Sequence, residues 1–330
     1  MAGLLAGLFM AVRGGLLSTE QCVLWLACMA PVFLAGFMED LFKKVEATWR
    51  LMAAFFAAAI AFFLLDGRLR PPGTSLLANE AFYPVLCFAF TLFAAGGVTH
   101  AFNIIDGLNG LLGGTALVGA VALAWMSHQV GDGELFAFSA SLAGGTAGFL
   151  IFNFPSGKLF AGDAGDYLIG FLVAEISVQL TERHSEVSPW FPLLLVVYPV
   201  TEVLFSAYRR RVLKKRPASQ ADALHLHSLL YKRVGLWIWG GSPGGKGRVF
   251  SNAFAAALLW LLTLLPTVVA VMFYDRKNIL IAASLLFVLC YILIYWKIVR
   301  FKTARPLIWV KEAWQRYNRS SRKSRFSATK

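Results

Sequence analysis

The sequence predicts an all-α, polytopic membrane protein with about ten transmembrane helices and active-site loops on the cytoplasmic side. Of its 330 residues, 58% are hydrophobic, and the mean hydropathy is +0.64, well above the usual composition of soluble domains. A bilayer core about 30 Å thick needs roughly 20 apolar residues per helix, and the apolar runs approach this length. The alternating segments of about ten residues that mark a membrane β-barrel are absent from the sequence.

Ten apolar runs are candidate spans, and polar connections separate them. They cover residues 2–17, 21–38, 51–65, 82–101, 108–127, 135–152, 166–180, 190–207, 251–272 and 279–298. We therefore expect residues 1–300 to form one integral membrane domain and residues 301–330 to form a basic cytoplasmic tail. All four cysteines lie in apolar runs and none forms a CxxC pair, which favours neither a disulfide framework nor a zinc site.

Four polar clusters follow the second, fourth, sixth and eighth runs, so they face the same compartment. They are Glu39-Asp40, Asn103–Gly110, Gly162–Asp166 and His225-Leu226-His227. Of the 31 lysines and arginines, 25 lie in these even connections and in the tail. Positive residues accumulate in the cytoplasm, which predicts cytoplasmic loops. The net charge of +13 follows from this topology, in which basic residues anchor the chain and attract anionic lipid headgroups. No recognised nucleic-acid-binding fold accompanies the charge.

The acidic pair Glu39-Asp40 ends an apolar run and precedes two lysines. Carboxylates at a helix exit can be interfacial charges that fix the topology. Adjacent acids can also orient a divalent cation or take a proton from an attacking group, and the pair alone does not decide between these readings. Arg50, eleven residues after Glu39, can reach a phosphate with its planar guanidinium.

The loop Asn103–Gly110 reads Asn-Ile-Ile-Asp-Gly-Leu-Asn-Gly and joins two apolar runs. Its glycines permit tight turns and a close approach of the backbone to a ligand. Asn103 and Asp106 supply oxygens suited to a hard cation such as Mg²⁺. A plain glycine-rich helix junction is the alternative, but an ionisable residue at the edge of hydrocarbon is usually functional.

In the segment Asn153–Asp166, one proline and several glycines interrupt the helical pattern, and Asp163 lies just before the next run. An aspartate at a helix start can be a simple N-cap. The flanking glycines also leave room for a ligand phosphate, and Asn153 and Lys158 add polar contacts. The cluster therefore favours a functional site.

His225 and His227 lie in a long connection that follows a basic run. Two histidines separated by one residue point the same way only in an extended or loop backbone. No cysteine or third histidine lies nearby to complete a tetrahedral zinc site. We expect them to donate to phosphate oxygens, with Lys232 and Arg233 assisting, while solvated surface histidines are the alternative.

Together these motifs resemble one family, the polyprenyl-phosphate N-acetylhexosamine-1-phosphate transferases (glycosyltransferase family 4). Its members include phospho-MurNAc-pentapeptide translocase and undecaprenyl-phosphate GlcNAc-1-phosphate transferase. The family signature is an acidic pair, an NxxDGxDG loop, a GDxGS loop and an HxHH loop, all cytoplasmic. The matching segments here are Glu39-Asp40, Asn103–Gly110, Gly162–Asp166 and His225–Ser228. The likeness extends over most of the chain, from about Gly3 to the histidine segment.

The resemblance implies transfer of an N-acetylhexosamine 1-phosphate from a UDP-sugar to undecaprenyl phosphate, with release of UMP. Such a reaction initiates a lipid-linked cell-surface glycan, such as lipopolysaccharide O-antigen or another cell-wall polymer. The implied cofactor is Mg²⁺, with Mn²⁺ as a substitute, and the implied location is the bacterial inner membrane. The implied partners are a polyprenyl phosphate acceptor and a UDP-amino sugar donor, and a homodimer is left open.

The resemblance also implies roles for residues. Asp163 and the Asn103–Asp106 loop would hold Mg²⁺ on the donor diphosphate, and the acidic pair would lie beside the lipid phosphate. The predicted catalytic residues are Glu39, Asp40, Asp106, His225 and His227; the substrate-binding residues are Arg50, Asn109, Asn153, Lys158 and Arg233; and the metal ligands are Asn103 and Asp163.

The chain departs from the family pattern at several positions. Glu39 replaces the usual first aspartate, Asn109 the second loop aspartate, Asp166 a serine and Ser228 the last histidine. The resembled subgroup has eleven spans, so ten spans suggest that the first family helix precedes this chain. Two other functions stay open. One is a transporter or flippase, although such proteins place ionisable residues near the midplane, and the other is a catalytically impaired scaffold.

Overall fold

The computed structural model describes residues 1–72, 74, 77–78, 80–213, 224–240, 245–300, 308, 310–311 and 314–315. Within these ranges all of the regular elements are helices. They are α1 (Ala2–Arg13), α2 (Thr19–Phe42), α3 (Ala47–Leu64), α4 (Tyr83–Ile105), α5 (Leu111–Gln129), α6 (Gly133–Asn153), α7 (Gly162–Arg183), α8 (Trp190–Leu195), α9 (Val197–Tyr208), η2 (Arg209–Leu213), α10 (Leu226–Leu229), η3 (Leu230–Gly235), α11 (Leu236–Trp239), α12 (Lys246–Met272) and α13 (Lys277–Val299). Most of the predicted basic tail lies outside the described residues.

The polytopic helical fold is confirmed, whereas the count of ten spans is not. In the described part of the chain, seven helices are long and apolar enough to cross a membrane: α2, α3, α4, α5, α6, α12 and α13. The predicted first span is only the 12-residue helix α1. Helix α7 has 22 residues, but its acidic side chains lower its hydropathy. The predicted span 190–207 is divided at Val196 into α8 and α9, so this segment is a broken helix.

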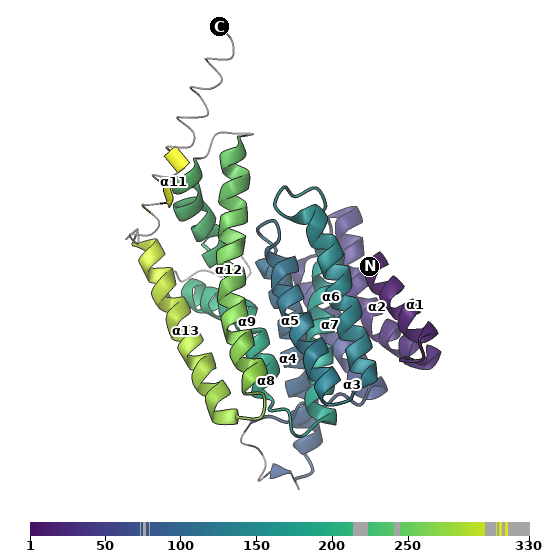
Figure 1. Cartoon of the computed structure of the whole chain (residues 1–330). Coiled ribbons are helices and arrows are strands. Elements are labelled where there is room, and N and C mark those ends of the chain that lie inside the picture. The colour runs from purple at the N-terminus through teal and green to yellow at the C-terminus, as the bar shows by residue number, and fades with distance from the viewer. Residues whose placement is uncertain are drawn as a thin grey trace.

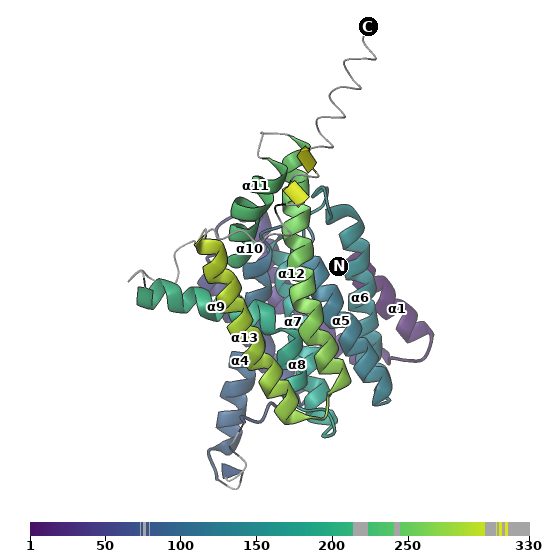
Figure 2. The ribbon, with the colours of Figure 1, turned by 60° about the vertical axis from the view of Figure 1, so that its left-hand side comes forward.

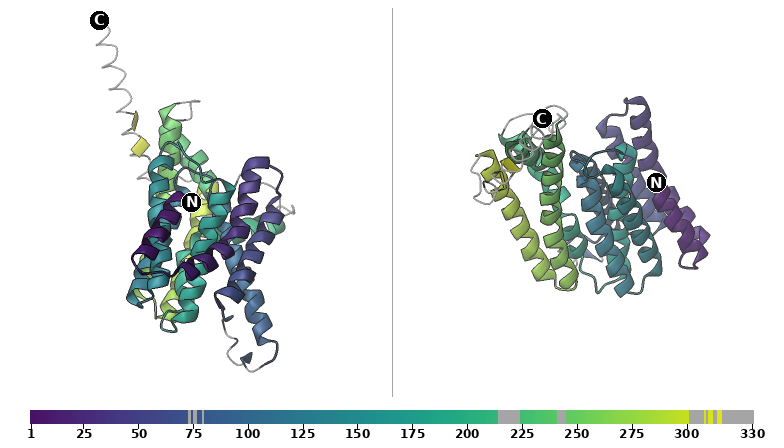
Figure 3. Two further views of the ribbon diagram at one scale, coloured as in Figure 1. Left: turned by 90° about the vertical axis from the view of Figure 1, so that its right-hand side faces the viewer. Right: turned by 45° about the horizontal axis from the view of Figure 1, so that its top comes forward.

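The helices form one bundle with α7 at its centre. Helix α7 packs against α2, α4, α5 and α6, and α5 packs against α6 and α12. Nearly all residues of α7 from Ala164 to Leu180 are buried. Helices α1 and α2 lie on one flank of the bundle, and α12 and α13 lie on the other (Figure 1), an order that is also visible in the further views of Figure 3.

The break between α8 and α9 changes the direction of the chain. Helix α9 runs across the direction of α12 and α13 rather than along it (Figure 2). It packs against α4, α12 and α13, and its buried positions include Thr201, Glu202 and Ser206. This crossing helix therefore carries polar side chains into the interior of the bundle.

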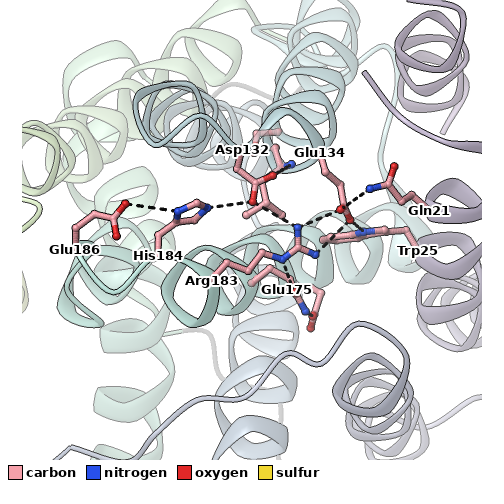
Figure 4. A network of polar contacts seen from close by, with 11 residues as sticks. Gln21, Trp25, Asp132, Glu134, Glu175, Arg183, His184 and Glu186 are labelled. Carbon is pink, nitrogen blue, oxygen red and sulfur yellow. Dashed lines mark hydrogen bonds and ion pairs between the residues drawn. The ribbon is translucent and has the colours of Figure 1, made fainter. Parts of the chain in front are cut away.

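A polar network joins the ends of α2, α6 and α7 at the end of the bundle opposite the sequence motifs (Figure 4). Arg183 donates hydrogen bonds to Asp132 (3.4 Å) and to Glu134 (3.1 Å). Glu134 also accepts a bond from the indole N–H of Trp25 at 2.7 Å, and His184 lies 3.1 Å from Asp132. We call this set of residues the clamp, because it ties three helices together.

Candidate active site

The four motifs meet at one end of the bundle, as the alternation of spans predicted. At their centre is Asp163, in the first turn of α7. Its Oδ1 accepts hydrogen bonds from the guanidinium of Arg50 in α3 and from the side-chain amide of Asn103 in α4, the latter at 2.7 Å. The Arg50 guanidinium also lies over the ring of Tyr167, 5.7 Å from its centroid. Two helices, α3 and α4, thus deliver polar groups to a carboxylate of a third, α7.

Asp40, at the end of α2, caps the N-terminus of α7. Its Oδ1 accepts from the backbone N–H of Asp163 and its Oδ2 from that of Ala164, both at 3.0 Å. A carboxylate at this position satisfies free helix N–H groups and opposes the positive end of the helix dipole. Gly162 has a φ of +67°, and a Cβ there would collide with the Asp40 carboxylate, so the close approach requires glycine.

Glu39, the other member of the acidic pair, binds the backbone of the turn after α2. Its Oε2 accepts a hydrogen bond from the backbone N–H of Val45 at 2.7 Å, which closes the turn between α2 and α3. In this arrangement Glu39 holds the loop, and Asp40 is the member of the acidic pair that reaches the cluster.

Two further acidic side chains lie in the same place. Asp106 ends α4, and Asp166 lies one turn after Asp163 in α7. Burial, together with the nearby charge of Asp163, raises the pKa of Asp106 to about 6. The Oδ2 of Asp166 accepts from Asn103 at 3.2 Å, whereas its buried Oδ1 has no hydrogen-bond partner among the described residues. We call Asp40, Asp106, Asp163 and Asp166, with Arg50 and Asn103, the acidic cluster.

The acidic cluster does not form a metal site made of protein ligands alone. Among the described residues, no group of three or more His, Cys, Asp or Glu side chains is arranged to hold a metal ion. Mg²⁺ is usually bound by one or two carboxylates together with water and substrate phosphates. The unpartnered Oδ1 of Asp166 and the adjacent carboxylates fit that kind of shared site, in which a phosphate-bearing ligand completes the coordination.

Asn109 and Asn153 join two of the loops to each other. The side-chain amide of Asn153 accepts from the backbone N–H of Gly110 and donates to the carbonyl of Leu159 at 2.7 Å. That of Asn109 donates to the carbonyl of Pro155 at 3.1 Å. Both predicted substrate-binding amides are therefore engaged with backbone, which holds the rim of the site in shape. The side chain of Lys158, by contrast, is exposed on this rim.

The histidine motif lies against the Asn103–Gly110 loop. The rings of His225 and His227 are stacked, with centroids 5.3 Å apart and an interplanar angle of 4°. The Nε2 of His227 abuts Gly107, where a Cβ would collide with the ring. Burial is the main cause that lowers the pKa of His227 to about 4, so this ring is neutral at pH 7. His225 retains a 12% exposed side chain and is the member of the pair that a ligand can reach.

The structure places Arg233 away from the acidic cluster. Its Nη1 donates to the carbonyls of Ile298 (3.2 Å) and Val299, at the end of α13. Cations are favoured at helix C-termini, where carbonyls lack intrahelical partners. Arg233 therefore caps α13, while its role in substrate binding stays a prediction.

Two polar residues at this end were missed in the sequence. Glu202 is fully buried in α9 and contacts His225, and Asp166 is 4% exposed beside Asn103. The available signal was an ionisable residue inside an otherwise apolar helix, which is a functional-site hypothesis by default. Which face of the helix Glu202 occupies could not be predicted, because α9 crosses the bundle.

Comparison with known proteins gives a family match. Residues 22–181 match the family model described as glycosyl transferase family 4. The chain is 30% identical over 207 residues to a Thermotoga maritima protein named undecaprenyl-phosphate alpha-N-acetylglucosaminyl 1-phosphate transferase, covering 63% of this chain and 61% of the relative. It is 29% identical over 204 residues to the phospho-N-acetylmuramoyl-pentapeptide-transferase of Lactobacillus gasseri, covering 56% and 61%.

A third relative, a probable undecaprenyl-phosphate N-acetylglucosaminyl 1-phosphate transferase of Bacillus subtilis, is 32% identical over 146 residues, covering 44% of this chain and 40% of the relative. The chain thus spans 40–61% of the length of these three relatives. The family match includes the acidic pair, the Asn103–Gly110 loop and Asp163, whereas the histidine motif lies beyond it.

Proposed function

Since residues 22–181 match the model of glycosyl transferase family 4, we propose that the chain transfers a sugar 1-phosphate from a UDP-N-acetylhexosamine to a polyprenyl phosphate and releases UMP. The observation that supports this most is the acidic cluster, in which Arg50, Asn103 and Asp163 meet from three helices. Such a cluster at one end of an apolar bundle suits a charged donor from the aqueous phase and an acceptor whose tail stays in lipid.

In the proposed reaction, an oxygen of the lipid phosphate attacks the phosphorus that carries the sugar. A new P–O–P bond forms to the lipid, and the bond from that phosphorus to the bridging oxygen of the nucleotide breaks. UMP leaves with this oxygen. Because two anions must approach each other, positioning and charge neutralisation are the main tasks of the protein.

The residues of the cluster divide these tasks. Arg50 supplies a fixed positive charge beside Asp163, and Asp40 holds the start of α7 in place. Asp163, Asp166 and Asp106, with the amide oxygen of Asn103, are the candidates to hold Mg²⁺, which Mn²⁺ can replace. When bound, the ion would neutralise negative charge on the donor diphosphate. His225, with its exposed edge, would meet a diphosphate oxygen.

An apolar cavity supports a lipid acceptor. It has a volume of about 150 Å³ and lies between α4, α7 and α8, and Leu69 and Arg70 of the α3–α4 connection place it towards the end of the bundle opposite the acidic cluster. Its wall is formed largely by hydrophobic side chains, among them Leu69, Phe90, Val98, Ala174, Trp190 and Leu193. We propose that part of the polyprenyl tail lies along this wall, while the phosphate of the acceptor reaches the acidic cluster.

Purified protein with undecaprenyl phosphate, Mg²⁺ and a panel of UDP-N-acetyl sugars tests the proposal. UMP release should require the lipid and the metal, and it should be lost in Asp106→Ala and Asp163→Ala. Removal of Mg²⁺ with EDTA should stop the reaction, and Mg²⁺ or Mn²⁺ should restore it. Absence of UMP release with every donor would instead favour a scaffold or a transporter.

We further propose that the motif-bearing end faces the cytoplasm of the bacterial inner membrane, because 25 of the 31 lysines and arginines lie in the connections at that end and in the tail. Cysteines introduced at the exposed positions Lys158 and Asp275, at opposite ends of the bundle, test this. In intact cells an impermeant maleimide should label Asp275→Cys and spare Lys158→Cys, with the parent chain as the control for native cysteines. The reverse pattern would invert the topology.

A further inference from the structure

Glu202 is the most completely buried carboxylate in the neighbourhood of the histidine motif. Its side chain has no exposed surface, and it belongs to the helix that crosses the bundle. Its Oε1 lies 3.0 Å from Nδ1 of His225 and accepts the backbone N–H of Leu226, also at 3.0 Å. The carboxylate therefore binds both the ring of His225 and the backbone that follows it.

Helix α9 presents a second polar group to the same ring atom. Ser206 lies four residues after Glu202, on the same face of the helix, and its Oγ is 3.1 Å from Nδ1 of His225. The Nη2 of Arg209 donates to this hydroxyl at 3.3 Å. These side chains form one stripe along α9 and fix the position of the loop that carries the histidines.

This contact determines which atom of His225 can serve a ligand. A ring whose Nδ1–H is given to a carboxylate has only Nε2 left for another partner, and the protonation pattern follows from the hydrogen bonds. The ring is also stacked on His227, whose Nε2 abuts Gly107 in the loop next to the acidic cluster. Glu202 is thus linked to the loop beside the acidic cluster by its contact with His225 and by the stacking of His225 on His227.

The partners of Glu202, rather than its burial alone, point to a role at the site. A carboxylate without exposed surface carries a large desolvation penalty, and the hydroxyl groups of Tyr198 and Tyr291 are further polar groups near Glu202. An apolar or amide side chain would fill the same space with less penalty. Glu175 is almost as buried but bonds within its own helix, whereas Glu202 joins α9 to the segment that carries the histidines.

We propose that Glu202 is a positioning residue of the transfer reaction: it orients His225 so that Nε2 faces the diphosphate of the bound donor. The inference rests on the proposed function. A ring held in this way donates to a phosphate oxygen when Nε2 also carries a proton, and the carboxylate of Glu202 balances the resulting positive charge. Glu202 itself contacts no substrate.

Three variants test the proposal: Glu202→Ala, Glu202→Gln and, as the matched control, Glu175→Gln. Glu175 is also a buried glutamate, 1% exposed, and its carboxylate accepts from Gln179 in α7 at 2.9 Å. We expect Glu202→Ala to lower kcat/KM for the donor about 10- to 100-fold, the usual effect of losing the carboxylate that orients a functional histidine. Glu202→Gln retains an acceptor for Nδ1–H and should lose less. Glu175→Gln should keep the parent value.

A second readout does not depend on catalysis. Diethyl pyrocarbonate modifies the unprotonated nitrogens of histidine, and mass spectrometry locates the modified residue. Loss of the Glu202 hydrogen bond should raise the modification rate of His225 about threefold or more in Glu202→Ala, while that of the exposed His128 stays constant. Glu175→Gln should leave both rates unchanged.

The kinetic and the modification experiments together decide whether Glu202 positions His225. Parent-like kcat/KM in Glu202→Ala, or an equal loss in Glu175→Gln, would overturn the positioning role. If the parent protein releases no UMP with any donor, the proposed function fails by itself, and the His225 modification rate still shows whether Glu202 controls the ring. An unchanged rate in Glu202→Ala would then overturn the inference as well.

Discussion

The two polar groups at opposite ends of the bundle differ in how their charges are matched. In the clamp, Arg183 lies between Asp132 and Glu134, and His184 bridges Asp132 and Glu186 (Figure 4). In the acidic cluster, four carboxylates converge. Arg50 forms an ion pair with Asp163, and Lys43 lies 3.7 Å from Asp40, while neither Asp106 nor Asp166 has an ion pair among those observed in the described part of the chain.

This difference is the one expected between a structural group and the ligand-binding site that we propose for the acidic cluster. The charged groups of the clamp are paired with one another. Substitution of a clamp residue should therefore lower the stability of the protein and leave the transfer reaction intact. Like charges held together in the acidic cluster destabilise the protein unless a cation joins them. Burial is the main cause that raises the pKa of Asp106 to about 6, and the nearby charge of Asp163 adds to it. The comparison therefore predicts opposite behaviour for carboxylates at the two ends.

The largest expected effect concerns paired Asp→Asn substitutions at the two ends. Asp163→Asn should reduce UMP release about 10²- to 10³-fold, because it removes negative charge at the centre of the acidic cluster. Asp132→Asn, in the clamp, should keep kcat and KM within about twofold for the protein that remains folded. Initial rates per folded molecule, counted from the monodisperse peak in detergent, measure both. Equal losses in the two variants would end the functional distinction between the clusters.

Removal of the clamp cation should give the second largest effect. Arg183→Leu leaves Asp132 and Glu134 without their positive partner, and breaking such a partly buried group should lower the free energy of unfolding by about 2–3 kcal/mol. The Arg183 side chain is 31% exposed, so the loss should be below that of a fully buried pair. Thermal unfolding of the purified protein measures it. A variant that keeps its Tm but loses activity would assign the clamp to the catalytic machinery.

Much of this arrangement could be predicted from the sequence. The alternation of apolar runs placed the four motifs at one end, and the contacts of Asp163 with Arg50 and Asn103 agree with that expectation. The polytopic helical fold is confirmed, and the resemblance is confirmed by the family match. The assigned roles of the site residues stay predictions.

The remaining features depend on tertiary packing that a single sequence does not reveal. The break at Val196 and the crossing of α9 decide that Glu202 points at His225. Arg233 was assigned to the site as a group that assists His225 and His227 at phosphate oxygens, whereas its Nη1 donates to a carbonyl at the end of α13. A residue's partner across the bundle depends on helix rotation, which hydropathy does not encode.

A pH dependence of stability should follow from His227. Its pKa is about 4 in the folded protein and about 6.5 when unfolded. The unfolded state therefore binds more protons between these values, and stability is lost as the pH falls from about 6.5 towards 4. Between pH 7 and pH 5 the loss should be no more than about 2 kcal/mol. His227→Gln should flatten this slope, whereas His184→Gln in the clamp should retain it. A slope unchanged in His227→Gln would show that another group governs acid unfolding.

The smallest expected effect concerns Arg233, which the sequence placed in the site and the structure places at the end of α13. Arg233→Ala removes hydrogen bonds to the carbonyls of Ile298 and Val299 and a favourable charge at a helix C-terminus, so the free energy of unfolding should fall by about 1 kcal/mol. The KM for the donor should stay at the parent value, because the guanidinium is engaged away from the acidic cluster. Lys158→Ala is the matched comparison, since the exposed Lys158 side chain lies on the rim of the site: it should raise KM for an anionic donor about two- to fivefold, as expected for an exposed charge contact, with an unchanged Tm. If Arg233→Ala raises the KM for the donor and leaves the free energy of unfolding unchanged, the guanidinium must leave the end of α13 when the donor binds. Arg233 would then be a residue that changes from a structural contact to a ligand contact, and the division between these two kinds of charge would not be fixed.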